Sequence, residues 1–257
     1  MRVGFLQFSP KFKERGENLK RIEELIKDTE ADLLVLPELS TTGYSFNSRE
    51  EIIPFAEEIP GYTSNRILKI ASYKKMLIVY GFIEKEGDRL YNSSLLVSPE
   101  GIVGKYRKLH LFYKEKLIFT PGDLPLKVFD IKGVKVGLLI CFDWIFPEAL
   151  RTLALKGAQI VCHSANLILP YCQDAMRTRA IENRVFIITA NRTGEEEEYR
   201  FTGRSQIVNP KGEIILTTDD KEEIVKVVDI DPAQALDKKV NEYNDLFKDR
   251  REGFYFR

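Results

Sequence analysis

Residues 32–38 read Asp-Leu-Leu-Val-Leu-Pro-Glu, an unbroken apolar run closed by a proline and a carboxylate. A strand with one buried face alternates apolar and polar side chains, whereas a strand buried on both faces reads as a continuous apolar run. The run therefore predicts a central strand covered on both faces. Before it, residues 18–27 carry apolar side chains at helical spacing, and Val3–Phe8 is short and β-prone.

Outward from this run, the order of elements predicts a layered fold. A helix is predicted over Ser64–Lys74 and a second buried strand over Met76–Ile83, whereas Arg107–Pro125 shows no regular period. Strands that alternate with helices and are interrupted by hairpins are typical of an α/β fold with a mixed sheet, and no linker-like segment divides residues 1–257 into domains. The other predicted strands are Leu90–Ser98, Ile102–Tyr106, Val128–Ile131, Val134–Ile140, Ile160–His163 and Val185–Ala190, and the other helices are Pro147–Lys156 and Gln173–Asn183.

The charge and length of the chain exclude several classes of protein. The 257 residues include 39 basic and 39 acidic side chains, so no basic field exists to bind a nucleic acid backbone. The longest strongly apolar stretch, Val136–Phe142, is far shorter than the ~18–20 residues that span a bilayer. An N-terminus that turns polar at once and an odd number of cysteines favour a cytoplasmic protein without a disulfide framework. The 30% of charged residues leans towards heat adaptation.

Familiar cofactor and metal motifs are missing from the sequence. There is no glycine-rich phosphate loop and no G-x-S-x-G nucleophile turn. The two histidines, His110 and His163, lack zinc-ligand spacing, so we expect polar or packing roles for them and neither metal nor cofactor. Cys162 and Cys172 are expected to be packing residues. The acidic run at 195–198 is most simply a solvated loop.

Three reactive side chains stand where predicted elements end. Glu38 and Cys141 each follow a buried strand, where ligands and catalytic groups gather in open α/β sheets, and Lys108 opens the irregular segment. Taken alone, each has a plainer interpretation: Glu38 as a loop carboxylate, Cys141 as a core cysteine and Lys108 as a surface lysine. Together, however, they supply a base, a nucleophile and a fixed cation, which complete one mechanism.

The same residues carry a resemblance to a known family. Leu-Pro-Glu at 36–38, Tyr-Arg-Lys-Leu-His at 106–110 and Cys-Phe-Asp-Trp-Ile-Phe-Pro-Glu at 141–148 resemble, in order, the three signature blocks of the nitrilase superfamily, the carbon–nitrogen hydrolases. Supporting stretches are Thr-Gly-Tyr at 42–44, Tyr-Asn-Ser at 91–93 and Phe-Thr-Pro-Gly-Asp at 119–123. The resemblance covers nearly the whole chain.

The resemblance implies both a fold and a catalytic site. The fold is a four-layer α-β-β-α sandwich with two mixed sheets. The site is a triad of Glu38, Lys108 and Cys141. A further residue, Glu115, would orient the lysine or the substrate nitrogen. The backbone N–H of Phe142 and the ammonium of Lys108 would hold the oxyanion formed on the way to a thioester. Members of the family often form homodimers, for which the aromatic C-terminal tail, about residues 241–257, is suited.

The substrate remains open among several alternatives. Cys-Phe-Asp-Trp resembles branches that cleave small linear amides or N-carbamoyl compounds and release ammonia, whereas nitrilases proper, the alternative, commonly carry Cys-Trp-Glu. An inactive binding scaffold is disfavoured by the intact triad. Tyr44, Trp144 and Asn166 either face the substrate or are structural. Arg177 and Arg179 either bind a substrate carboxylate or pair with Glu182 on a helix surface.

Overall fold

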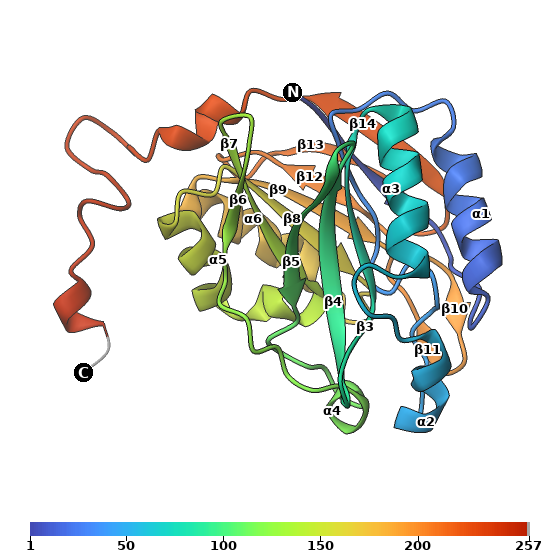
Figure 1. Cartoon of the computed structure of the whole chain (residues 1–257). Helices are drawn as coiled ribbons and strands as arrows, with labels where there is room; N and C mark the ends of the chain where they lie inside the picture. The colour runs from blue at the N-terminus through green and yellow to red at the C-terminus, as the bar shows by residue number, and fades with distance from the viewer. Residues whose placement is uncertain (256–257) are drawn as a thin grey trace.

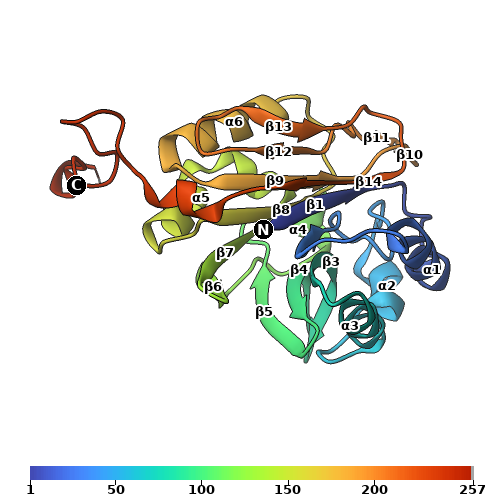
Figure 2. The ribbon, with the colours of Figure 1, turned by 90° about the horizontal axis from the view of Figure 1, so that it is seen from above.

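The computed structural model describes residues 1–255 and consists of two β-sheets packed face to face between two layers of helices (Figure 1). Figure 2, seen from above, shows the sheets stacked in the middle, with helices on the outer side of each. The expected four-layer α/β fold with two mixed sheets is confirmed.

The first sheet is built around the apolar run at residues 32–36. Its three central strands are parallel, and antiparallel strands lie on both sides of them. In spatial order the strands are β14 (Ile224–Asp229), β1 (Arg2–Gln7), β2 (Leu33–Val35), β3 (Leu77–Glu86), β4 (Arg89–Ser98) and β5 (Gly101–Arg107).

The second sheet repeats this plan with three parallel strands at its centre. In spatial order its strands are β13 (Ile214–Thr217), β12 (Gln206–Val208), β9 (Phe186–Asn191), β8 (Ile160–Ala165), β7 (Val134–Ile140) and β6 (Val128–Ile131). The parallel strands of both sheets end at the same end of the molecule. This follows from a hydrogen bond of Asn166, in the segment after β8, to Glu38, in the segment after β2.

Helices cover the outer face of each sheet. The helices α1 and α3 pack on the first sheet, and α5 and α6 pack on the second (Figure 2). The helices are α1 (Arg15–Ile26), α2 (Arg49–Ile52), α3 (Tyr62–Lys74), α4 (Glu115–Ile118), α5 (Pro147–Leu155) and α6 (Cys172–Asn183), with 3₁₀ turns at Ile53–Phe55, Cys141–Ile145, Pro232–Leu236 and Glu252–Phe254.

The apolar run in β2 accounts for the layering. Leu33 and Val35 belong to the core between the two sheets, whereas Leu34 and Leu36 belong to the core under α1 and α3. Because successive side chains of a strand point to opposite faces, the run fills two cores at once. All four side chains are fully buried.

Two local expectations need correction. The acidic run at 195–198 is not simply a solvated loop, because it forms a small hairpin of β10 (Glu195–Glu196) and β11 (Tyr199–Arg200) in which Glu196 is buried. The segment 107–125 is mainly irregular as expected, but it contains the short helix α4.

The tail expected at 241–257 leaves the body of the molecule after β14 (Figures 1 and 2), and residues 256 and 257 lie outside the described residues. Within residues 1–255 no helix is long and apolar enough to cross a bilayer.

Candidate active site

The candidate site lies where parallel strands of both sheets end. Glu38 comes shortly after β2 and Lys108 directly after β5, both in the first sheet, whereas Cys141 follows β7 in the second. Glu115 begins α4 in the long loop between the two sheets. The sequence-predicted groups are therefore brought to one end of the sandwich, the end at which open α/β sheets bind ligands.

Lys108 links the two glutamates. Its Nζ donates to Glu38 Oε1 and to Glu115 Oε1, each at 2.7 Å, and its side chain is completely buried. Asn92 donates to the same Glu38 oxygen at 2.7 Å, and the Tyr44 hydroxyl donates to the same Glu115 oxygen at 2.9 Å. Each carboxylate thus receives a neutral donor in addition to the ammonium, as buried ions require.

Burial and charge act in opposite directions on this cluster. Burial by itself lowers the pKa of Lys108, but the nearby carboxylates of Glu115 and Glu38 raise it above its ordinary value, so the amine stays protonated. Burial raises the pKa of Glu115, an effect that Lys108 opposes and the charge of Glu38 reinforces. The cluster therefore holds a permanent cation between two carboxyl groups that compete for it.

Cys141 lies at a sharp turn directly after β7. Its φ is +41°, a left-handed conformation that is unusual for a residue with a side chain, and its Sγ lies 3.7 Å from the main-chain oxygen of Asn166. Burial raises the pKa of the Cys141 thiol well above its ordinary value, the charge of Glu38 raises it further and Lys108 opposes both. The resting thiol is therefore held in its neutral form.

Asp143 ties the lysine segment to the cysteine turn. One of its oxygens accepts from the Tyr106 hydroxyl at 2.7 Å and from the backbone N–H of Ile140 at 3.0 Å. The other lies 2.7 Å from Nδ1 of His110, whose backbone N–H also donates to it at 3.2 Å. Tyr106 and His110 flank Lys108 in sequence, so one fully buried carboxylate fixes the lysine segment against the turn that carries Cys141.

A small cavity opens beside Cys141, and its wall is mainly apolar. The residues that line it are Phe112, Cys141, Phe142, Trp144, Asn166, Leu167, Ile168 and Leu169.

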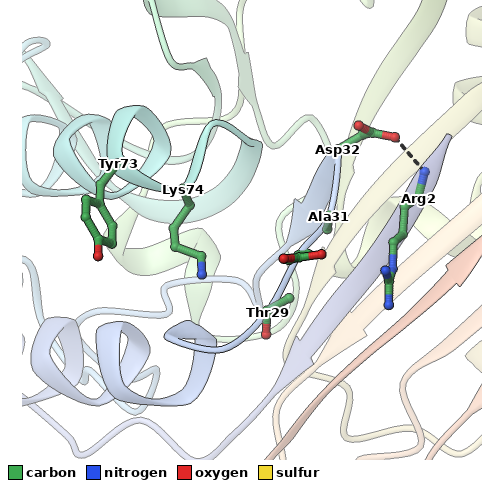
Figure 3. Close-up of a pocket in the computed structure, with 7 residues that line it drawn as sticks. Arg2, Thr29, Ala31, Asp32, Tyr73 and Lys74 are labelled. Atoms are coloured by element: carbon green, nitrogen blue, oxygen red, sulfur yellow. Dashed lines mark hydrogen bonds between the residues drawn. The ribbon is translucent and has the colours of Figure 1, made fainter.

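A wider hollow lies at the opposite end of the strands (Figure 3). It has a volume of about 610 Å³, and Arg2 at the start of β1 and Asp32 just before β2 contribute to its lining. The side chain of Asp32 accepts a hydrogen bond from the Arg2 backbone N–H at 2.6 Å. Because this hollow lies at the amino ends of β1 and β2, it is remote from Glu38 and offers none of the groups described above.

Some of the candidate pocket residues line the cavity, whereas others contact different groups. Phe142, Trp144 and Asn166 line the cavity beside Cys141, whereas Tyr44 hydrogen-bonds to Glu115. Arg179 pairs with Glu182 at 3.3 Å, which favours the helix-surface interpretation of that arginine.

The remaining helix and core candidates lie away from the cavity lining. Arg177 donates through Nε to the Gly212 carbonyl oxygen at 3.1 Å. Cys162 and Cys172 are fully buried among apolar side chains, as expected of packing residues, and burial raises the pKa of both thiols. Within residues 1–255 no group of three or more His, Cys, Asp or Glu side chains is placed to hold a metal ion.

Sequence reasoning missed several residues of this site, among them Asn92, Asp143 and His163. His163 is fully buried, and its Nε2 lies 2.9 Å from the main-chain oxygen of Cys141. Asn92 and Asp143 stood inside the quoted motifs, so their position in those motifs was a usable signal. His163 lies one residue after Cys162 in a strand, and nothing in the local pattern points to its contact with Cys141.

Comparisons with known proteins show which family the chain is similar to. A family model described as carbon-nitrogen hydrolase matches residues 2–238. The chain is 48% identical over 261 residues to a nitrilase from Pyrococcus abyssi, with 100% of both chains covered. It is 35% identical over 257 residues to an (R)-stereoselective amidase from Pseudomonas sp, covering 98% of this chain and 92% of that one.

A solved structure is similar over almost the whole chain. It is a mutant of the amidase from Nesterenkonia sp. AN1 that carries acrylamide, added by Michael addition, at its active-site cysteine. The TM-score is 0.82 at 25% sequence identity, and the match covers 98% of this chain and 97% of that one.

The fold and the matches define an enzyme that hydrolyses carbon–nitrogen bonds. This chain belongs to the carbon–nitrogen hydrolase family, within the nitrilase superfamily.

The contacts of Asp143 predict that it acts by positioning. In Asp143→Asn the shape is kept, but the carboxylate that accepts from both Tyr106 and His110 is lost, so we expect kcat to fall by about 10- to 100-fold with little change in KM. Steady-state kinetics with an amide that the wild-type enzyme hydrolyses measures kcat and KM, and thermal melting checks that the variant is folded. Asp28→Asn, whose side chain is 89% exposed in the turn after α1, is the matched control. A folded Asp143→Asn enzyme with an unchanged kcat would contradict the prediction.

His163 predicts a dependence of stability on pH. Burial lowers the pKa of His163 to about 4, from an ordinary value of 6.5. Unfolding therefore takes up a proton between these values, so stability is unaffected by this group above about pH 6.5 and falls by about 3 kcal/mol as the pH approaches 4.

Urea unfolding of the wild type and His163→Gln at steps between pH 7.5 and 4.5 measures this loss. The variant is expected to start less stable and to lose less on acidification, because it has no imidazole to protonate. Two curves that run parallel over the whole range would show that His163 does not carry the effect.

Proposed function

We propose that this enzyme hydrolyses a small linear amide or N-carbamoyl compound through a thioester on Cys141, with release of ammonia. The observation that carries the proposal is the buried Lys108 ammonium held between Glu38 and Glu115 at the end of the sandwich where Cys141 turns. An amide in water is hydrolysed slowly because no positioned nucleophile, base or oxyanion donor assists the reaction.

In the first half of the reaction, Glu38 acts as the base. Its Oε1 is engaged by Lys108 and Asn92, whereas its Oε2 is buried and has no hydrogen-bond partner among residues 1–255. Oε2 accepts the Cys141 proton as Sγ attacks the carbonyl carbon. The Lys108 ammonium and the backbone N–H of Phe142 stabilise the oxyanion, and the proton held by Glu38 then passes to the leaving nitrogen.

In the second half, water replaces ammonia. Glu38 removes a proton from the incoming water, whose oxygen attacks the thioester carbon. The carbon–sulfur bond breaks, the thiolate takes back the proton, and the acid leaves. Glu115 stays bound to Lys108 throughout and, with Tyr44, keeps the ammonium in place.

The cavity supports a small, uncharged acyl group. Apart from Cys141, Asn166 and the indole N–H of Trp144 the lining side chains are apolar, and none of the described lining residues is cationic. A substrate carboxylate would lose its hydration there without gaining a cationic partner. This favours short aliphatic acyl groups over those that carry a second carboxylate.

A nitrile is the second candidate substrate. The 48% identical relative from Pyrococcus abyssi is named a nitrilase, and the same cluster can add a thiolate to a nitrile carbon. Against this stands Cys-Phe-Asp at 141–143 in place of Cys-Trp-Glu. Both reactions converge on one thioester, so only substrate turnover separates them.

We further propose that the enzyme acts as a homodimer in the cytoplasm. The tail extends away from the body (Figure 1) and exposes Tyr243 and Tyr255, aromatic side chains that suit a contact with a second copy. All three cysteines are free, as a reducing compartment would keep them.

Ammonia release by the purified enzyme and by Cys141→Ala tests the proposed function. The panel holds propionamide, the ω-amide of a dicarboxylic acid, an N-carbamoyl amine, an N-carbamoyl amino acid and a small dinitrile. We expect turnover of propionamide or the carbamoyl amine, none by Cys141→Ala, and an acyl adduct by intact mass and peptide mapping on Cys141 rather than Cys162. Turnover of the dinitrile alone would establish the nitrile alternative. An adduct on Cys162 would refute the assigned nucleophile.

Removing the buried cation should slow acylation. In Lys108→Met the oxyanion loses one donor and Glu38 faces Glu115 without a counter-charge, so we expect kcat/KM to fall by at least about 100-fold. Lys116→Met, an exposed lysine on α4, is the control and should retain wild-type activity. Single-turnover kinetics measures the acylation step, and a normal rate in Lys108→Met would remove the lysine from the mechanism.

A further inference from the structure

The side chain of Asn166 has a fixed orientation. Its Nδ2 donates to the main-chain oxygen of Glu38 at 2.9 Å. Only the NH₂ end of an amide can donate to a carbonyl, so the contact itself determines which end is nitrogen and which is oxygen. The opposite end, Oδ1, is therefore an acceptor held in place by the backbone of the proposed base.

That acceptor lacks a partner within the protein. Asn166 is 1% exposed, and its Oδ1 has no hydrogen-bond partner among residues 1–255. A buried polar atom without a partner costs about 1–3 kcal/mol, so such atoms are rare and call for an explanation.

The position of Asn166 supplies the explanation. The residue directly follows β8, and its main-chain oxygen lies 3.7 Å from Cys141 Sγ. Asn166 lines the cavity together with Cys141, and no other lining side chain carries an oxygen acceptor. Asn92 also has an unpartnered Oδ1, but it does not appear in the cavity wall, so the two asparagines differ in what they can meet.

We propose that Asn166 Oδ1 accepts a hydrogen bond from an N–H of the scissile amide or carbamoyl group, and so makes Asn166 a specificity-determining residue. The inference rests on the proposed function and narrows it. A primary amide or carbamoyl nitrogen brings N–H donors to the wall, whereas a nitrile nitrogen carries no hydrogen until Sγ has added to the carbon. The free acceptor therefore favours amide-like substrates in the ground state.

The test compares two substrates that give the same propionyl thioester on Cys141. Propionamide has N–H donors, and S-methyl thiopropionate has none. In Asn166→Leu, which removes the acceptor, we expect kcat/KM for propionamide to fall about tenfold further than kcat/KM for the thioester.

Asn166→Asp is the matched control for the bond to Glu38. It loses the Nδ2 donor to Glu38 but keeps an acceptor oxygen, so both substrates should be slowed while their ratio stays near the wild-type value. Equal losses on both substrates in Asn166→Leu would overturn the inference, because they would mean that Asn166 acts only by positioning Glu38.

A second measurement does not depend on the Asn166 variants folding. Cys141→Ala protein, which retains Asn166, should bind propionamide about tenfold more tightly than propionitrile in isothermal titration. Equal binding of the two would overturn the inference while leaving the proposed function intact. Wild-type turnover of nitriles but not amides would overturn both.

Discussion

The ammonium of Lys108, completely buried between Glu38 and Glu115, is the interaction on which the site depends. An ion in an apolar interior is tolerated only when charges and hydrogen bonds compensate its lost hydration. The donors that complete the cluster come from distant parts of the chain: Asn92 from β4 and Tyr44 from the loop after β2. The position of Tyr44 is fixed in turn, since its backbone N–H donates to the buried Glu196 at 2.7 Å. One cation thus organises loops from several elements.

The proposed base and nucleophile belong to different sheets, so catalysis requires that the sheets keep a fixed relation. Apolar packing between them is non-directional and cannot set the distance between two atoms. Polar contacts are directional and can fix this distance. The Asp143 carboxylate accepts hydrogen bonds from Tyr106 and His110 of the lysine segment. Asn166 donates a hydrogen bond to the main-chain oxygen of Glu38. His163 anchors the other side of the Cys141 turn.

The sequence predicted the elements and the reactive groups better than it predicted their supports. The continuous apolar run at 32–36 and the placement of Glu38 and Cys141 at strand ends follow from periodicity, which is local. The pairing of two sheets came from the resemblance, because periodicity does not say which strands are neighbours. Glu196 was missed since its partner Tyr44 is 152 positions away, and an acidic run by itself indicates solvent. The burial of Glu196 depends on the hairpin of β10 and β11, which the local sequence does not reveal.

The cluster also limits what can distinguish an amide from a nitrile. In the proposed mechanism Glu38 takes the Sγ proton, and Lys108, held by Glu115, acts on the charge that develops as Sγ adds to the substrate carbon, which happens with both substrates. Discrimination must therefore come from groups that meet the substrate before addition, when the amide has N–H donors and the nitrile has none. In the described cavity wall the side chain that offers an oxygen acceptor is Asn166, whose donor end is already occupied by Glu38. The substrate preference of this enzyme is accordingly a property of its wall, and the three signature blocks that place it in the family leave that preference open.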